Sequence, residues 1–164
     1  MRALRRPIAI LRILIGAAFV AMGVAKLSNA EFLYGGLMHA MEAAGRAFPF
    51  YEDFLARYVD THQTFFAYAV GLGELLLGIS YFTGTFISLS SLAGAFMVLN
   101  FAFATCYGAP GRLTAQVAGV VLLLMLGRMG AGLTWGLDRW LVRRSRSTFV
   151  LLPLRRTVPA YQKS

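Results

Sequence analysis

The fold is decided by residues 65–107, which read FFAYAVGLGELLLGISYFTGTFISLSSLAGAFMVLNFAFATCY. This stretch contains two apolar runs, 65–86 and 89–107, and a single charged residue, Glu74. A helix rises about 1.5 Å per residue, so a run of about 20 residues crosses the ~30 Å hydrocarbon core of a bilayer. The two runs therefore predict two membrane-spanning helices, and the short turn between them makes these helices antiparallel neighbours.

Two further runs of the same kind lie outside this stretch, at residues 8–28 and 113–133. Hydrophobic residues make up 58% of the chain and charged residues 14%, whereas soluble domains average about 45–50% and about 25%. A soluble domain of this composition has too little polar chain to cover four such helices. The sequence therefore predicts an all-α integral membrane protein, a four-helix up-down bundle in which residues 1–164 form one membrane domain. The run at 8–28 also resembles a signal peptide, but it is long for one and Arg12 interrupts it.

Lysine and arginine are concentrated near the two termini. An even number of spans places both termini on one side, where the basic tail at 134–164 joins the arginines that precede residue 8. Ten basic residues then lie on that side and three on the other, so the positive-inside rule predicts cytoplasmic termini in a bacterial-type inner membrane. The ten are Arg2, Arg5, Arg6, Arg139, Arg143, Arg144, Arg146, Arg155, Arg156 and Lys163, and the three are Arg46, Arg57 and Arg112.

The outer segment at 29–63 connects the first two spans on the opposite side. It carries five acidic residues and two arginines. Tyr51, Phe54, Leu55 and Tyr58 recur at helical spacing, with charged residues on the other face, which predicts an amphipathic helix lying on the membrane surface or capping the bundle. An ordered loop without regular helix is the alternative. A second, weaker helix, loosened by a Gly-Gly pair, is expected from Phe32, Leu33, Leu37, Met38 and Met41.

The net charge of +9 raises nucleic acid as a partner. The basic residues adjoin apolar spans, however, and no aromatic–basic module accompanies them, so we expect membrane lipids as partners and no nucleic acid.

The lone Cys106 permits neither an internal disulfide nor a Cys-rich metal site, and two histidines are too few for most metal sites, so no metal is expected. His39 and His62, near the outer surface, are candidates to bond a quinone carbonyl or a haem iron, although a lone surface histidine usually does neither.

Four charged residues fall within the predicted spans. Each costs about 2.5–3.5 kcal/mol near the midplane, so these side chains are expected to turn inward and find partners. Counting along the helices places Glu74 and Asn100 near mid-membrane, and Arg12 and Arg128 closer to the cytoplasmic side. Lys26 comes out near the outer surface, where its amine can reach water. The sequence thus predicts a polar core with Glu74 at its centre, Asn100 beside it, and the two arginines approaching from the cytoplasmic side.

Two interpretations of this polar core stay open. A carboxylate inside the membrane can serve proton transfer or a quinone, which makes Glu74, Arg12, Arg128 and Asn100 the candidate catalytic residues. An ion pair that only fixes how the helices pack is the structural alternative. The glycines next to Glu74 fit close helix packing better than a ligand cavity.

Several short motifs follow one another through spans one, two and four. They are Arg12-Ile-Leu-Ile-Gly16, Phe19 and Gly23 with Lys26-Leu27, Gly71-Leu-Gly-Glu74-Leu with Gly78 and Gly84, Gly130-Ala-Gly132, and Leu137-Asp138-Arg139. In the order and spacing of these motifs the chain resembles the DoxX family of small four-span membrane proteins. The resemblance covers most of residues 8–141.

The resemblance implies a membrane redox context, because relatives include the DoxD-type subunit of thiosulfate:quinone oxidoreductase and proteins linked to thiol or oxidative-stress systems. The first expectation is an accessory subunit of a larger membrane-bound redox or electron-transfer complex, with other membrane subunits as partners. The alternative is a quinone-linked oxidoreductase subunit, with quinone as cofactor and a polar core around Glu74. The long basic tail and the outer segment depart from the family pattern, so the thiosulfate reaction is not carried over.

Overall fold

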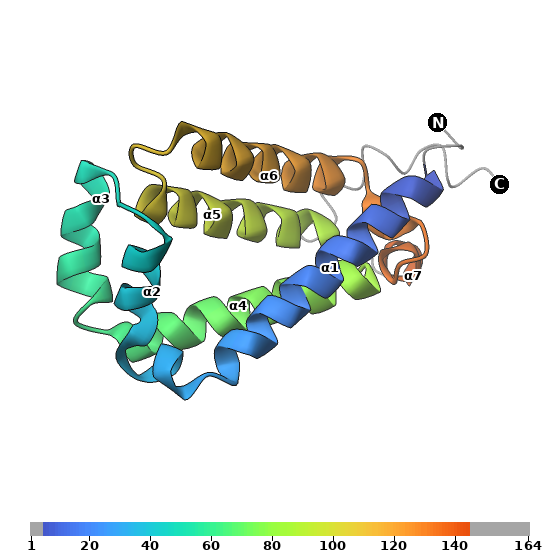
Figure 1. Cartoon of the computed structure of the whole chain (residues 1–164). Coiled ribbons are helices and arrows are strands. Elements are labelled where there is room, and N and C mark those ends of the chain that lie inside the picture. Colours follow the sequence, from blue (N-terminus) through green and yellow to red (C-terminus); the bar gives the residue numbers. More distant parts are fainter. Residues whose placement is uncertain (1–4, 145–164) are drawn as a thin grey trace.

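The computed structural model describes residues 5–144, and within that range every regular element is helical. Four helices are long and apolar enough to cross a membrane. They alternate in direction along the chain (Figure 1), so the predicted all-α, four-helix up-down bundle is confirmed. The four are α1 (Arg5–Leu27), α4 (Gln63–Thr83), α5 (Ile87–Thr105) and α6 (Pro110–Arg128).

The helix ends differ from the predicted spans in ways that proline and glycine explain. α6 begins at Pro110 instead of residue 113, because proline lacks the N–H that a first helical turn leaves unpaired. The same helix ends at Arg128 instead of residue 133, since Gly130 adopts a left-handed φ of 64°. α4 ends at Thr83 for the same reason, with Gly84 at a φ of 73°.

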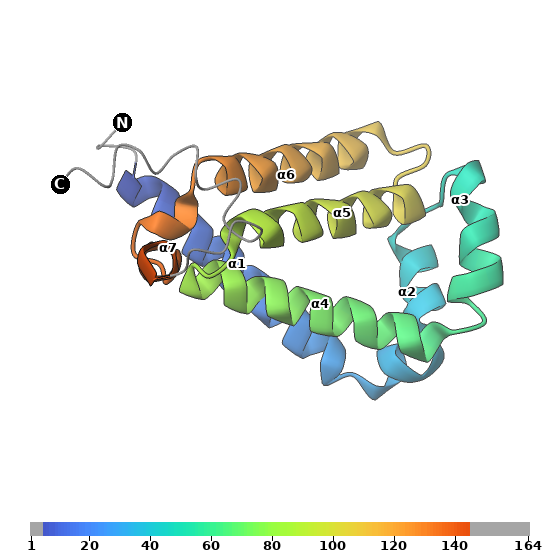
Figure 2. The same ribbon diagram turned by 180° about the vertical axis from the view of Figure 1, so that it is seen from behind.

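The four long helices form two pairs. α1 packs along α4, and α5 packs along α6 (Figures 1 and 2). Glycine allows the first pair to approach closely: a Cβ atom on Gly16 would lie 2.5 Å from the Phe82 nitrogen, and one on Gly78 would lie 2.5 Å from the Val20 nitrogen. The two pairs meet at one end of the molecule and diverge toward the other (Figure 1).

The outer segment closes the divergent end of the bundle. It consists of η1 (Phe32–Gly36), α2 (Leu37–Ala44), α3 (Pro49–Phe54) and η2 (Leu55–Val59). Apolar side chains of this segment are buried against α4 and α5, while acidic ones face outward. The predicted apolar face is buried only in part, because Leu55 is buried whereas Phe54 and Tyr58 are 37% and 58% exposed. We call this the acidic end; it carries Glu31, Glu42, Glu52, Asp53 and Asp60, and its buried apolar residues are Leu33, Leu37, Leu55 and Val59.

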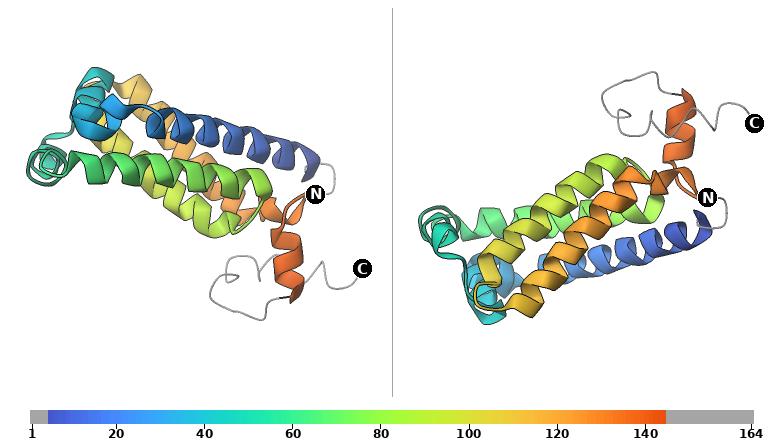
Figure 3. Two further views of the ribbon diagram at one scale, coloured as in Figure 1. Left: turned by 90° about the horizontal axis from the view of Figure 1, so that it is seen from below. Right: turned by 90° about the horizontal axis from the view of Figure 1, so that it is seen from above.

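The opposite end, which we call the basic end, carries η3 (Ala131–Leu133) and α7 (Asp138–Arg144) beside the start of α1. Figure 3 shows that α7 turns away from the direction of the long helices. Trp135 and Trp140 are 61% and 58% exposed there. The predicted basic tail extends beyond residue 144 and from that point lies outside the described residues.

Candidate functional site

Glu74 is almost wholly buried within the bundle. Its side chain lies on α4 and is 2% exposed. Lys26, one residue before the end of α1, donates a hydrogen bond to Glu74 Oε1 and forms an ion pair with it. The other carboxylate oxygen, Oε2, has no hydrogen-bond partner among residues 5–144. The sequence placed Lys26 near the outer surface as a snorkelling amine; the close packing of α1 on α4 directs it instead to the buried acid.

Lys26 also connects the ion pair to α5. Its Nζ atom lies 5.3 Å from the centre of the Phe101 ring, a distance at which a cation is attracted to an aromatic face. Phe101 in turn lines a pocket between α4, α5 and the outer segment. The Glu74–Lys26 pair is therefore linked through Lys26 to one aromatic side chain of that pocket.

This pocket, which we call the α4–α5 pocket, has a volume of about 420 Å³. Ligand pockets for small molecules commonly measure about 300–1,000 Å³ and are mostly apolar with a few polar groups. Fourteen residues from α2, α3, η2, α4 and α5 line it, and nearly all are aromatic or aliphatic. They are Met41, Tyr51, Phe54, Leu55, Val59, Phe66, Ala69, Val70, Ala93, Phe96, Met97, Asn100, Phe101 and Ala104.

Tyr51 and Asn100 are the hydrogen-bonding side chains of the pocket wall. The Tyr51 hydroxyl donates to Asn100 Oδ1 at 2.6 Å, and Asn100 Nδ2 donates to the carbonyl oxygen of Phe96 at 2.7 Å. The Phe96 carbonyl can only accept, so this pattern fixes which end of the amide bears the hydrogens. One Nδ2 hydrogen has no acceptor within the described residues. Burial raises the pKa of Tyr51, which keeps its hydroxyl protonated and able to donate.

Asn100 and Glu74, which the sequence places at the same depth, are not hydrogen-bonded to each other. The amide bonds to Tyr51 and Phe96, and the carboxylate bonds to Lys26. Asn100 lines the pocket, and Glu74 is linked to it only through Lys26 and Phe101, so the sequence identified both residues but not their partners. The tyrosine was missed because it lies on the outer segment, where the sequence showed only an amphipathic face.

Arg12 does not approach Glu74 at all; it lies at the basic end. The side chain is wholly buried and donates from Nη2 to the carbonyl oxygen of Trp135 at 3.1 Å. Close contacts with Gly84 and Gly136 leave no room for larger residues there. The predicted placement of Arg12 beneath Glu74 is therefore wrong, because the chain after α6 folds back and supplies a closer carbonyl and a closer acid.

That acid is Asp138, at the start of α7. Its carboxylate accepts hydrogen bonds from the backbone nitrogens of Phe86 at 2.6 Å and Ile87 at 3.1 Å, at the first turn of α5. Burial raises the pKa of Asp138, while these two N–H groups and the positive charge of Arg12 oppose that rise. Asp138 thus caps a helix to which it is not connected in sequence. The sequence offers a signal, an Asp directly before Arg-Trp-Leu, but this Asp lies after the last predicted span.

Arg128 ends α6 and is exposed at the basic end. Neither Glu74 nor Asn100 contacts it, so the structure removes it from the predicted polar core. A basic residue in the last turn of a helix interacts favourably with the helix dipole.

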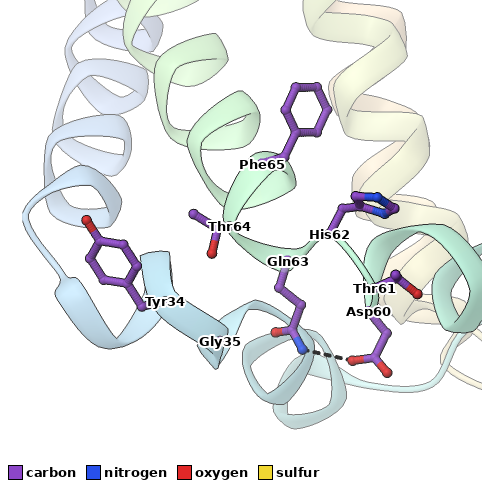
Figure 4. Close-up of a pocket in the computed structure, with 8 residues that line it drawn as sticks. All are labelled: Tyr34, Gly35, Asp60, Thr61, His62, Gln63, Thr64 and Phe65. Carbon is purple, nitrogen blue, oxygen red and sulfur yellow. Dashed lines mark hydrogen bonds between the residues drawn. The ribbon is translucent and has the colours of Figure 1, made fainter.

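The two histidines lie on the outside of the acidic end and do not share a site. His62 lines an open surface pocket of about 570 Å³ together with Tyr34 and Gln63, whose amide donates to Asp60 at 2.8 Å (Figure 4). His39 is exposed on α2 and is not part of that pocket. No group of three His, Cys, Asp or Glu side chains gathers within residues 5–144.

Comparison with known proteins gives a family but no individual relative. No curated protein and no solved structure matches the chain significantly. The family model described as DoxX matches residues 8–107, a range that includes α4, α5, the whole outer segment and nearly all of α1. The match covers more than half of the chain and contains every residue of the α4–α5 pocket. The chain therefore belongs to the DoxX family of membrane proteins.

Proposed function

We propose that the chain is a quinone-binding integral membrane subunit of a larger redox complex, in which it supplies a binding pocket rather than an electron-transfer centre. The α4–α5 pocket carries this proposal. It combines about 420 Å³ of apolar volume with one polar wall, formed by Tyr51 and Asn100. A quinone likewise has an apolar part and a polar part. Its flat ring and hydrocarbon tail suit the apolar wall, and its carbonyl oxygens suit a hydrogen-bond donor.

The residues of the pocket fit such a ligand in defined ways. The second Nδ2 hydrogen of Asn100 can donate to a carbonyl oxygen, and the Tyr51–Asn100 bond holds the amide in that orientation. Phe54 and Phe101 offer aromatic faces for a planar ring. When bound, a quinone supplies two-electron, two-proton chemistry. The Glu74–Lys26 pair, whose amine lies 5.3 Å from the centre of the Phe101 ring, offers ionisable groups that can hold or release a proton. In this proposal the electrons come from a partner subunit.

Quinone binding to the purified chain tests the pocket. In lipid nanodiscs, a short-tailed ubiquinone analogue is expected to bind saturably in equilibrium dialysis. Asn100→Leu is expected to weaken binding by about tenfold, because one hydrogen bond is worth about 0.5–1.5 kcal/mol. Asn29→Leu, which changes the other asparagine of the chain at an exposed site, is the matched control. Equal affinity in Asn100→Leu and wild type contradicts the proposal.

Glu74→Gln separates binding from proton handling. The substitution keeps the size of the side chain, and Glu74 is not one of the residues that line the pocket. We expect the analogue to bind with nearly wild-type affinity, whereas quinone-dependent electron transfer in the membrane complex is lost. Unchanged turnover in membranes that contain only the variant would remove Glu74 from the proposal.

The orientation of the chain belongs to the same proposal. With both termini in the cytoplasm of an inner membrane, the acidic end faces the outside. A membrane-impermeant thiol reagent added to intact cells is expected to label Arg57→Cys and to leave Arg128→Cys unlabelled until the cells are permeabilised. Cys106 is buried and provides a low background. The reverse labelling pattern would overturn this orientation.

A further inference from the structure

The basic end exposes no acidic side chain within the described residues. No acidic residue precedes Glu31 in the sequence, and Asp138 is the only one that follows Glu74. Asp138 is 1% exposed because it caps α5 and lies beside Arg12. The one negative charge at this end is therefore withdrawn from the surface, and the charge that remains outside is positive.

Exposed basic residues reach this end from three separate helices. Arg6 lies in the first turn of α1, Arg128 in the last turn of α6, and Arg139 on α7. These three helix ends lie together at one end of the molecule (Figure 1). Arg143 and Arg144 follow on α7 in the sequence. Because three separate helices provide Arg6, Arg128 and Arg139, these arginines form a surface and not a single run of charge in the sequence.

Large apolar side chains share that surface. Trp135, Leu137 and Trp140 are each more than half exposed. Tryptophan prefers the headgroup depth of a bilayer, where its ring is in an apolar environment and its N–H can be hydrogen-bonded. A surface that combines arginines with exposed tryptophans, next to the ends of membrane-spanning helices, fits anionic lipid headgroups better than it fits a soluble acidic protein.

The surface is also connected to the interior of the bundle. α7 begins at Asp138, whose carboxylate accepts from the first turn of α5, and Arg12 of α1 bonds to the carbonyl oxygen of Trp135. Any force that holds α7 and the preceding turn in place therefore also holds the cap on α5 and the contact with α1.

We infer that the basic end is a binding surface for anionic phospholipid headgroups, and that this binding stabilises the attachment of α7 to α5 and α1. The positive-inside rule requires only that the charges stay on one side of the membrane. A binding surface has a further property: it responds to the fraction of anionic lipid at constant topology.

The two tryptophans of the chain report on this surface directly, since Trp135 and Trp140 are the only ones. The full-length chain is reconstituted in phosphatidylcholine nanodiscs with increasing fractions of phosphatidylglycerol. We expect the tryptophan emission to move to shorter wavelength and the melting temperature to rise as the anionic fraction increases. High salt is expected to weaken both effects, because exposed charges are screened.

Arginine variants test the assignment to this surface. Arg128→Gln and Arg139→Gln are each expected to raise the phosphatidylglycerol fraction at half-effect by about fivefold, the equivalent of about 1 kcal/mol per basic residue near an anionic surface. Arg57→Gln changes an exposed arginine at the acidic end and is the matched control, with no change expected. Identical emission in both lipids, or identical responses in all three variants, overturns the inference.

Two further experiments complete the test. The first distinguishes anionic lipid from other occupants of the surface, and the second distinguishes lipid binding from its effect on stability. Polyglutamate added to pure phosphatidylcholine discs should leave the emission unchanged; a shift of the same size would assign the surface to an acidic macromolecule and overturn the lipid assignment. Asp138→Asn is expected to retain the emission shift and to lose the gain in melting temperature. A full gain in that variant would overturn the coupling to α5.

Discussion

Glu74 illustrates how one residue can be located by sequence while its partner is not. Helical counting placed it correctly within a span, but its cation comes from the first helix and was expected at the surface. The partners differ in exposure: the Lys26 side chain is 28% exposed and that of Glu74 is 3% exposed. Because of this difference, we expect substitution of Lys26 and substitution of Glu74 to lower the free energy of unfolding by unequal amounts.

Lys26→Met is expected to destabilise the protein more than Glu74→Gln. The first leaves a carboxylate buried without a cation, which costs about 3–5 kcal/mol for a broken buried pair. The second leaves an amine that can extend toward the headgroups, so its cost is about 1–2 kcal/mol. Reversible unfolding in mixed micelles measures both free energies. The double variant is expected to be more stable than the sum of the two losses implies; strict additivity would mean that the pair does not interact.

Asp138 makes the stability of the basic end depend on pH. Its pKa is raised above 3.8 in the folded chain, with burial as the largest cause. The folded state then binds this proton more tightly than the unfolded state, so the contribution to stability is fully present below about pH 4. It is lost as the pH rises through the raised pKa. Asp138→Asn is expected to flatten this part of the profile of unfolding free energy against pH, while Asp53→Asn, at an exposed acid, leaves it unchanged.

At the scale of elements, the α1–α4 pair depends on glycine. Gly16 and Gly78 bring the two backbones together, with no space for a methyl group. Gly16→Ala and Gly78→Ala are therefore each expected to lower the unfolding free energy by about 1–3 kcal/mol, the usual cost of overpacking. Gly119 on α6 is a matched control, because its nearest neighbour would be 4.0 Å from an added Cβ atom.

Gly119→Ala is expected to be neutral or slightly stabilising, since alanine favours helix by up to about 1 kcal/mol over glycine. Thermal unfolding followed by circular dichroism compares the three variants. Equal losses in all three would show that the glycines act through helix propensity and not through the close contact between helices.

At the scale of the whole molecule, the two helix pairs form a wedge that is held differently at its two ends. Buried bonds close the basic end, including Tyr81 to Ser91 at 2.7 Å. At the acidic end the outer segment bridges the pairs. Its ties to α5 include the Tyr51–Asn100 bond and a bond from the Phe48 nitrogen to the Phe103 carbonyl at 2.9 Å. The pocket therefore lies under a cover with few polar attachments.

Tyr51→Phe is expected to loosen this cover without changing the bundle. Loss of one hydrogen bond, worth about 1 kcal/mol, should increase amide hydrogen exchange in α3 and η2 by about fivefold. Exchange in α1 and α4 should stay as in wild type. Tyr34→Phe removes an exposed hydroxyl contact with Tyr68 and is the control. Faster exchange spread evenly over all helices would contradict a cover that loosens separately from the bundle.

The sequence by itself determined that lipid surrounds the four long helices and that these helices form an up-down bundle. Four apolar runs of sufficient length, with few charges, require lipid around them, and an even number of short-linked spans gives an up-down bundle. The amphipathic outer segment followed from periodicity for the same reason, since burial of one face is encoded locally. The family resemblance, carried by short motifs with Gly16, Glu74 and Gly84 among them, was confirmed by the family match.

Only the tertiary structure decided which polar groups meet. Lys26 reaches Glu74, Tyr51 reaches Asn100, and Asp138 reaches the first turn of α5, although each pair is separated by about 50 positions or by a whole helix. Depth along a span is fixed by counting residues, but rotation about the helix axis and the choice of neighbour depend on how the helices pack. Glycine contacts and a returning C-terminal segment set that packing, and neither leaves a periodic signal in the sequence.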